Sequence, residues 1–115
     1  AQYKRQAEDQ KLKKAYTNSH TALQKKNEAL TQLKKQIAFQ QDQLKQLQKD
    51  RIMFVRQERE FLRKAKETPQ HLKTTLANNE KNLNAQKENI QSLQSRYRKL
   101  EAEYDRIIHR LKSLE

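Results

Sequence analysis

Apolar residues recur along most of the chain at alternating spacings of three and four, the heptad pattern of a coiled coil. With Leu23 at position a, one segment keeps this spacing as far as Phe61, and a second keeps it from Leu72 to Leu114. About six heptads in each segment predict two long helices with a narrow apolar seam, and they argue against disorder. The apolar seam residues of the first segment are Leu23, Leu30, Leu33, Ile37, Leu44, Leu47, Phe54 and Phe61. Those of the second are Leu72, Leu76, Leu83, Ile90, Leu93, Tyr97, Leu100, Tyr104, Ile107, Leu111 and Leu114.

The break between the two segments lies at Thr68 and Pro69. Thr68 suits the N-cap of a helix, and Pro69 suits its first turn, where the missing N–H costs nothing. A single kinked helix is the alternative, because Pro disrupts the hydrogen bonding of a continuous helix. The register favours reversal, because a turn at residues 67–68 sets apolar seam residues opposite apolar ones and polar opposite polar. The pairs so predicted include Phe61–Leu76, Phe54–Leu83, Leu47–Ile90, Glu58–Asn79 and Arg51–Gln86, with two mixed pairs, Gln40–Tyr97 and Lys26–Leu111.

A cluster of capping residues at Tyr16–His20 marks the start of the first arm. The predicted fold is therefore all-α: a long antiparallel two-helix coiled-coil hairpin with an N-terminal helical overhang. Residues 1–17 form the overhang or a short helix, and residues 18–115 form the hairpin. Its arms are expected at about 19–66 and 69–115.

Composition agrees with this fold and removes several classes of function. The 115 residues include no Gly and no Cys, and only 33% are hydrophobic, too few for a broad core but enough for a seam. Without Gly there is no phosphate-binding loop, and without Cys no disulfide or thiolate metal site. No nucleophile–base set and no metal-ligand spacing is evident, and no apolar run approaches the roughly 20 residues of a membrane span. We therefore expect no catalytic, cofactor-binding or metal-binding residues: the protein is predicted not to be an enzyme.

The charge is strongly basic, with 26 Lys and Arg against 14 Asp and Glu, a formal net charge of +12. Such an excess attracts polyanions: nucleic acid, anionic envelope polymers or an acidic protein. A solvated helix surface is the plain alternative. Five cations near the expected turn are the candidate anion-binding residues: Arg56, Arg59, Arg63, Lys64 and Lys66.

A second apolar stripe runs beside the seam in the first arm. A two-helix hairpin cannot cover two stripes, so this one is predicted to contact a protein partner or a second copy of the chain. The alternative is cover by the stems of neighbouring Arg side chains. The candidate contact residues are Ile52, Met53, Val55 and Leu62.

Three short stretches resemble a group of poorly characterised gammaproteobacterial periplasmic coiled-coil hairpin proteins: Ala15–Ser19, Thr68–Leu72, and Glu103–Arg106 with Arg110. The resemblance spans residues 15–115. It implies a periplasmic location and a structural or adaptor role in the bacterial envelope, with a cytoplasmic location as the alternative. Two further hypotheses remain: a basic coiled-coil arm that binds nucleic acid, and a secretion-apparatus stalk or chaperone.

Overall fold

The computed structural model describes residues 2–115, whose regular elements are three α-helices: α1 (Gln2–Tyr16), α2 (Ser19–Arg63) and α3 (Gln70–Leu114). The all-α prediction is confirmed. The chain divides into two compact units. The loop unit is Gln36–Leu93, and the terminal unit consists of residues 2–35 together with 94–115.

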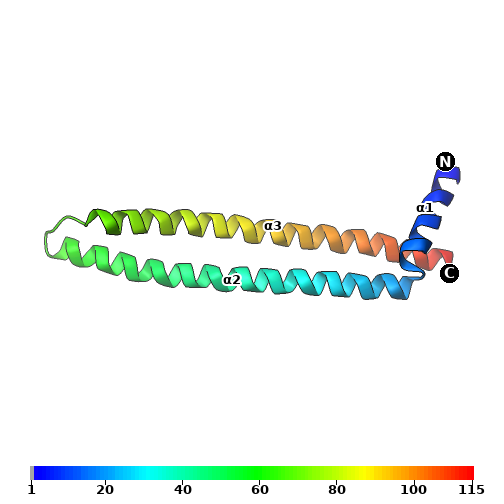
Figure 1. The fold of residues 1–115 in the computed structure, drawn as a ribbon, viewed down its shortest axis with the longest axis horizontal. Coiled ribbons are helices and arrows are strands. Elements are labelled where there is room, and N and C mark those ends of the chain that lie inside the picture. The colour runs from blue at the N-terminus through cyan, green and yellow to red at the C-terminus, as the bar shows by residue number, and fades with distance from the viewer. Residues whose placement is uncertain (1) are drawn as a thin grey trace. The chain divides into compact units, whose positions relative to one another are not determined.

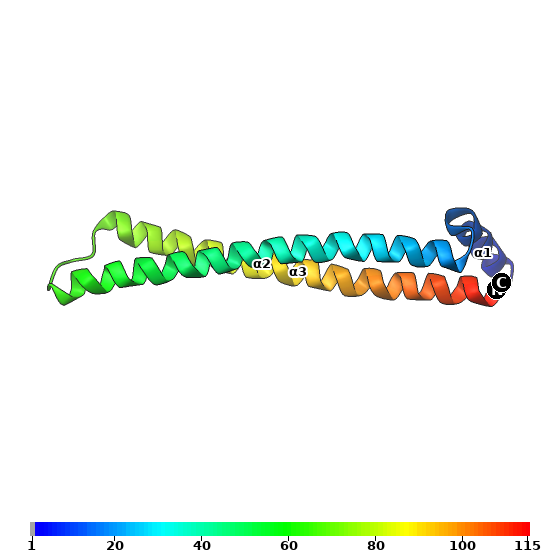
Figure 2. The same ribbon diagram turned by 90° about the horizontal axis from the view of Figure 1, so that it is seen from below.

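In the loop unit, α2 and α3 lie side by side and antiparallel, joined by the connection at residues 64–69 (Figures 1 and 2). Three residues of α3 form its buried apolar core: Leu72, Leu83 and Ile90. The seam residues of α2 in this unit are half-buried. The predicted chain reversal, and with it the helical hairpin, is confirmed.

The first arm ends earlier than predicted, because a C-terminal capping motif stops α2 at Arg63. The Lys66 N–H donates to the Phe61 carbonyl (2.9 Å), and the Ala65 N–H donates to the Leu62 carbonyl (3.0 Å). These two bonds form a Schellman motif with Ala65 at the left-handed position, at φ 55°. Residues 64–66 therefore belong to the connection, and the predicted arm to 66 with a turn at 67–68 is wrong. The second arm begins at Gln70, one residue later than predicted.

The pairing register in the loop unit differs from the prediction. Asn79, predicted to face Glu58, accepts a hydrogen bond from Arg51 (Nη1–Oδ1 3.3 Å), seven residues earlier in α2. Asn79 also donates to the Leu47 carbonyl (Nδ2–O 3.0 Å). Gln86, predicted to face Arg51, donates to the Gln40 carbonyl (Nε2–O 2.9 Å) and to its side chain. The partners in α2 therefore lie seven to eleven residues earlier than predicted, an offset of one heptad or slightly more.

The offset has a simple physical cause. A shift of one heptad returns every seam position to an equivalent a or d position, so the apolar pattern alone does not distinguish the two registers. Two features favour the observed register: the connection at residues 64–69, which is longer than the predicted turn, and the polar partners of Asn79. Asn79 is only 5% exposed, and a buried amide without hydrogen-bond partners would be costly.

In the terminal unit, the first part of α2 and the last part of α3 pack together, and α1 lies against their ends (Figures 1 and 2). Lys26 pairs with Asp105 (Nζ–Oδ1 2.6 Å), rather than lying opposite Leu111 as predicted. Ser19 begins α2 and donates from both its backbone N–H and its hydroxyl to the Glu115 carboxylate (2.7 and 3.0 Å). These contacts join the start of α2 to the end of α3.

The seam prediction fails at one residue of this unit. Leu23 is 42% exposed, whereas the neighbouring Ala22 is fully buried. Consecutive residues of α2 here face different neighbours, since Lys25 contacts α1 and Lys26 contacts α3. At the start of α2 the buried face therefore differs from the predicted seam, whereas further along the seam residues Leu30 and Leu33 are buried.

Candidate partner-binding site

The second apolar stripe lies on the surface of α2 in the loop unit. Ile52 and Met53 are each 53% exposed, and Leu62 is 62% exposed. Val55 is half-buried beside the seam residue Phe54. All four predicted contact residues thus retain surface available for another molecule.

A groove of about 510 Å³ gathers part of this stripe with part of the predicted cation cluster. Its apolar members are Ile52 and Val55, and Arg56 and Arg59 contribute cations. The spacings of three, four and seven residues put these side chains on one face of the helix. The complete lining is Gln48, Arg51, Ile52, Val55, Arg56 and Arg59. Met53 and Leu62 lie outside it.

The five predicted anion-binding residues fall into two groups in the structure: those that form ion pairs within the chain and those that do not. Arg63 forms a two-point hydrogen bond with Glu60 (3.3 and 2.6 Å), and the Lys64 ammonium is 3.7 Å from the same carboxylate. The hydrogen bond from Arg63 holds the pKa of Glu60 below its ordinary value and raises the pKa of Arg63. Lys66 lies in the connection. Among the described residues, ion pairs engage neither Arg56 nor Arg59, so the groove contains two cations that remain available to a partner.

Arg51 is a groove residue outside the five predicted anion-binding residues, and the heptad pattern assigns it to the seam. Its guanidinium reaches Asn79 at the seam, and the residue also lines the groove. A seam position occupied by Arg gives a usable signal, because the long side chain tends to leave the seam and carry its charge to the surface. Arg51 thereby adds a third cation to the groove.

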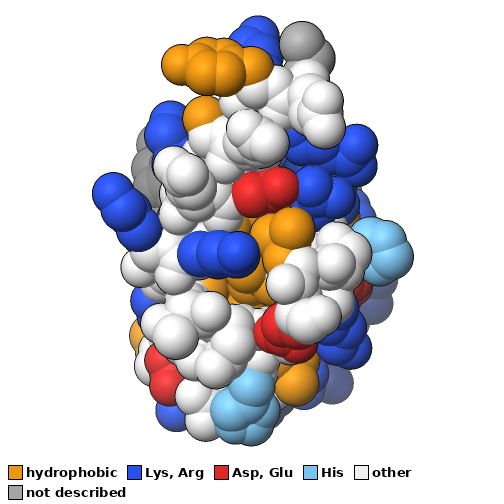
Figure 3. Space-filling view, turned by 90° about the vertical axis from the view of Figure 1, so that its right-hand side faces the viewer, with side chains coloured by type: hydrophobic (Ala, Val, Ile, Leu, Met, Phe, Trp, Pro, Cys, Tyr) orange, Lys and Arg blue, Asp and Glu red, His pale blue; other side chains and the backbone are white. Residues whose placement is uncertain are grey.

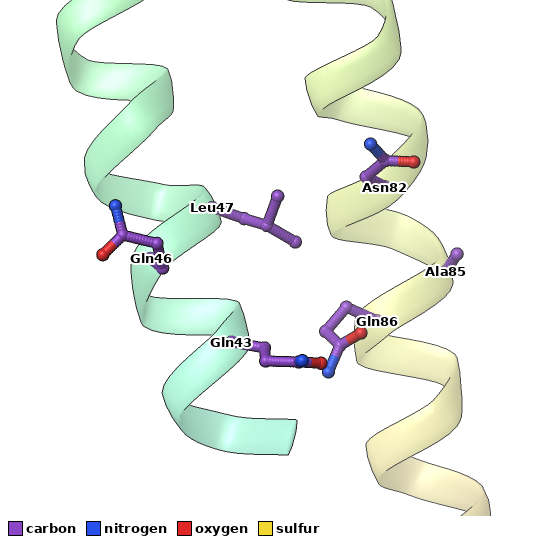
Figure 4. Close-up of a pocket in the computed structure, with 6 residues that line it drawn as sticks. All are labelled: Gln43, Gln46, Leu47, Asn82, Ala85 and Gln86. Carbon is purple, nitrogen blue, oxygen red and sulfur yellow. The ribbon is translucent and has the colours of Figure 1, made fainter. Parts of the chain in front are cut away.

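A second groove, of about 410 Å³, opens between α2 and α3 in the loop unit. Figure 4 shows Leu47 directed toward α3 and the side chains of Gln43 and Gln86 approaching each other. The Gln40 side chain beside it accepts from both Gln86 and Asn89, the latter at 3.1 Å. These amides bond mainly to one another. We therefore interpret them as a structural contact between α2 and α3 that leaves fewer polar groups free for a partner than the groove on α2.

Comparisons with known proteins supply no relative: no protein-family model, curated protein or solved structure matches the chain. Within residues 2–115, no helix combines the length and apolar character needed to cross a membrane. Over the same residues, His, Asp and Glu side chains form no group of three or more placed to share a metal ion.

Proposed function

We propose that the chain is a non-catalytic structural or adaptor protein: a coiled-coil hairpin that binds an acidic protein partner through the groove on α2. The heptad spacing, with buried Leu72, Leu83 and Ile90 along α3, supports coiled-coil packing. The binding proposal rests on one observation: the apolar side chains of Ile52 and Val55 line the same groove as the cationic side chains of Arg56 and Arg59.

The chemistry of the groove favours an acidic amphipathic helix as its occupant. Such a helix would lay its apolar face on Ile52 and Val55 while carboxylates at its edges reach the Arg side chains. A purely charged polymer would leave the apolar residues uncovered. A second copy fits less well, because pairing two identical grooves would bring Arg51, Arg56 and Arg59 near their own counterparts.

The test uses a synthetic amphipathic helical peptide with Leu on one face and Glu on the others. We expect Arg56→Glu with Arg59→Glu to weaken its binding by about tenfold or more, because attraction becomes repulsion at two points. Val55→Asp should also weaken binding, because it charges the apolar floor. The matched control is Arg96→Glu with Arg98→Glu, the same charge change on exposed residues of the terminal unit. Isothermal titration calorimetry measures all four proteins, and equal affinities for the two double variants would reject the groove.

Self-association through the stripe is tested on the same proteins by sedimentation at several concentrations. A dimer that Val55→Asp dissociates would replace the acidic helix by a second copy as occupant of the groove. Association that Val55→Asp leaves unchanged supports the acidic partner, because the stripe then takes no part in it.

We further propose that the adaptor works in the bacterial envelope, and the support is the resemblance carried by residues 15–115. The full reading frame fused to alkaline phosphatase tests this location, since that reporter needs the disulfides that form after export. An inactive fusion, present in normal amounts, would place the chain in the cytoplasm.

A further inference from the structure

The terminal unit contains a short helix held at few points. Both carboxylate oxygens of Asp9, in α1, accept from the Arg110 guanidinium in α3 (2.8 and 2.7 Å). About two turns further along α1, the rings of Tyr16 and Tyr104 meet edge to face at 6.2 Å. The Lys25 ammonium lies 5.1 Å from the Tyr16 ring and donates to the Ala15 carbonyl (3.2 Å).

Little apolar surface accompanies these contacts. α1 has no buried residue along Gln2–Tyr16. Leu12 is half-buried, in a groove of about 420 Å³ that it shares with Glu103, Arg106 and Ile107 of α3. A polar 15-residue helix is marginal in water without such support. α1 is therefore held mainly by Arg110 and Tyr104, so detaching it sacrifices little buried surface.

The link between α1 and α2 is short and strained. Thr17 has φ 62°, the left-handed region that a β-branched residue rarely occupies. Asn18 follows at once as the N-cap of α2, accepting from the Thr21 N–H (2.9 Å). Only two residues separate the helices. This conformation accompanies the folding back of α1, so we expect that releasing α1 relieves the strain.

We propose that α1 is exchanged between two copies of the chain, so that the surface of Tyr104, Ile107 and Arg110 in one copy takes α1 of the other. A short hinge under strain favours such exchange. The exchanged dimer repeats the contacts of Asp9, Leu12 and Tyr16 with no new surface, which makes it an inexpensive route to association. This dimer is independent of the groove on α2.

Charge complementation between two variants tests the exchange. Asp9→Arg sets like charges at positions 9 and 110, and Arg110→Asp does the same with the opposite sign, so each variant alone should be monomeric. In a mixture, α1 of each variant meets an opposite charge on the other, and a heterodimer should form. Sedimentation velocity detects the heterodimer. The measurement is made at about physiological salt, which screens the repulsion between the basic terminal units of the two copies. The unmodified chain should dimerise increasingly with concentration.

The matched control is a mixture of Glu8→Arg and Lys112→Asp, which changes similar charges outside the Asp9–Arg110 pair. These two proteins should behave alike whether mixed or separate. Circular dichroism confirms that α2 and α3 stay helical in every variant. A mixture of Asp9→Arg and Arg110→Asp that stays monomeric would overturn the exchange, as would an unmodified chain that is monomeric at every concentration.

Discussion

Two residues adopt backbone conformations that usually belong to glycine. Thr17 and Ala65 both have positive φ, of 62° and 55°, and each stands where one helix ends. The chain contains no Gly, so these positions are filled by residues whose Cβ atoms disfavour the left-handed region by roughly 1–2 kcal/mol. The capping cluster at Tyr16–His20 indicates the break at Thr17, but nothing in the sequence indicates the one at Ala65, which is why the end of the first arm is predicted three residues too late.

Ala65→Gly should stabilise the chain, because glycine occupies the left-handed position of a Schellman motif without steric cost. We expect the free energy of unfolding to rise by up to about 1 kcal/mol, since greater freedom of the unfolded chain offsets part of the gain. Ala77→Gly, on the exposed surface of α3, is the control and should lose about 1 kcal/mol. Urea denaturation measures both, and a loss at both positions would contradict the capping geometry.

At the scale of the helix, the heptads predict which residues meet but not how far one helix slides along the other. Leu72, Leu83, Ile90 and Leu111 were predicted as seam residues and are buried. The register differs by about a heptad because both registers have the same apolar pattern, and the polar contacts of Asn79 and Gln86 and the capped end of α2 favour one of them. Of the candidate site, the exposed stripe could be predicted, whereas the engagement of Arg63 and Lys64 by Glu60 depends on side-chain conformations that spacing does not decide.

Replacing both polar residues, Arg51→Leu with Asn79→Leu, should stabilise the hairpin and weaken its choice of register. Removing a buried polar contact in favour of apolar packing contributes about 1–2 kcal/mol. A second register, displaced by about 10 Å along the helices, should then become populated. Spin labels on cysteines at Lys45 and Lys87 report it as a second distance. Lys49→Leu with Asn82→Leu, at exposed positions, is the control. If both proteins show one unchanged distance, the Arg51–Asn79 contact does not set the register.

The docking of α1 should depend on pH at both ends of the scale. The hydrogen bond from Arg110 lowers the pKa of Asp9 from 3.8. The contribution of Asp9 to the docking of α1 is therefore present above pH 3.8 and is lost as pH falls through the lowered pKa. Burial, with Tyr16 nearby, raises the pKa of Tyr104 from 10.0, so its contribution is present below that value and is lost as pH rises through the raised pKa. Fluorescence transfer between labels at Lys4 and Arg98 should stay constant between about pH 4 and 10 and fall outside this range. Asp9→Asn should remove the acidic transition alone, and an acidic transition that survives this change would assign it to another group.

At the scale of the whole chain, positive charge is unevenly shared between the units. The terminal unit carries 15 Lys and Arg against seven Asp and Glu, and the loop unit carries 11 against seven. Figure 3 shows the basic side chains spread over the end of the terminal unit, with few acidic ones among them. Any polyanion is therefore attracted to the chain as a whole, whereas the proposed groove lies in the less basic unit.

This distribution separates adaptor binding from nucleic-acid binding. For duplex DNA, attraction follows total charge, so Arg56→Glu with Arg59→Glu and Arg96→Glu with Arg98→Glu should weaken retention similarly, each lowering the net charge of +12 by four. Retention should also fall steeply with salt, because it depends on the release of counterions.

The acidic amphipathic peptide should instead bind the two double variants with different affinities. Its affinity should also fall less as salt rises, because Ile52 and Val55 supply an apolar contact that salt does not screen. Fluorescence anisotropy over a series of salt concentrations measures both probes. DNA binding that is lost in one double variant alone would make nucleic acid the partner.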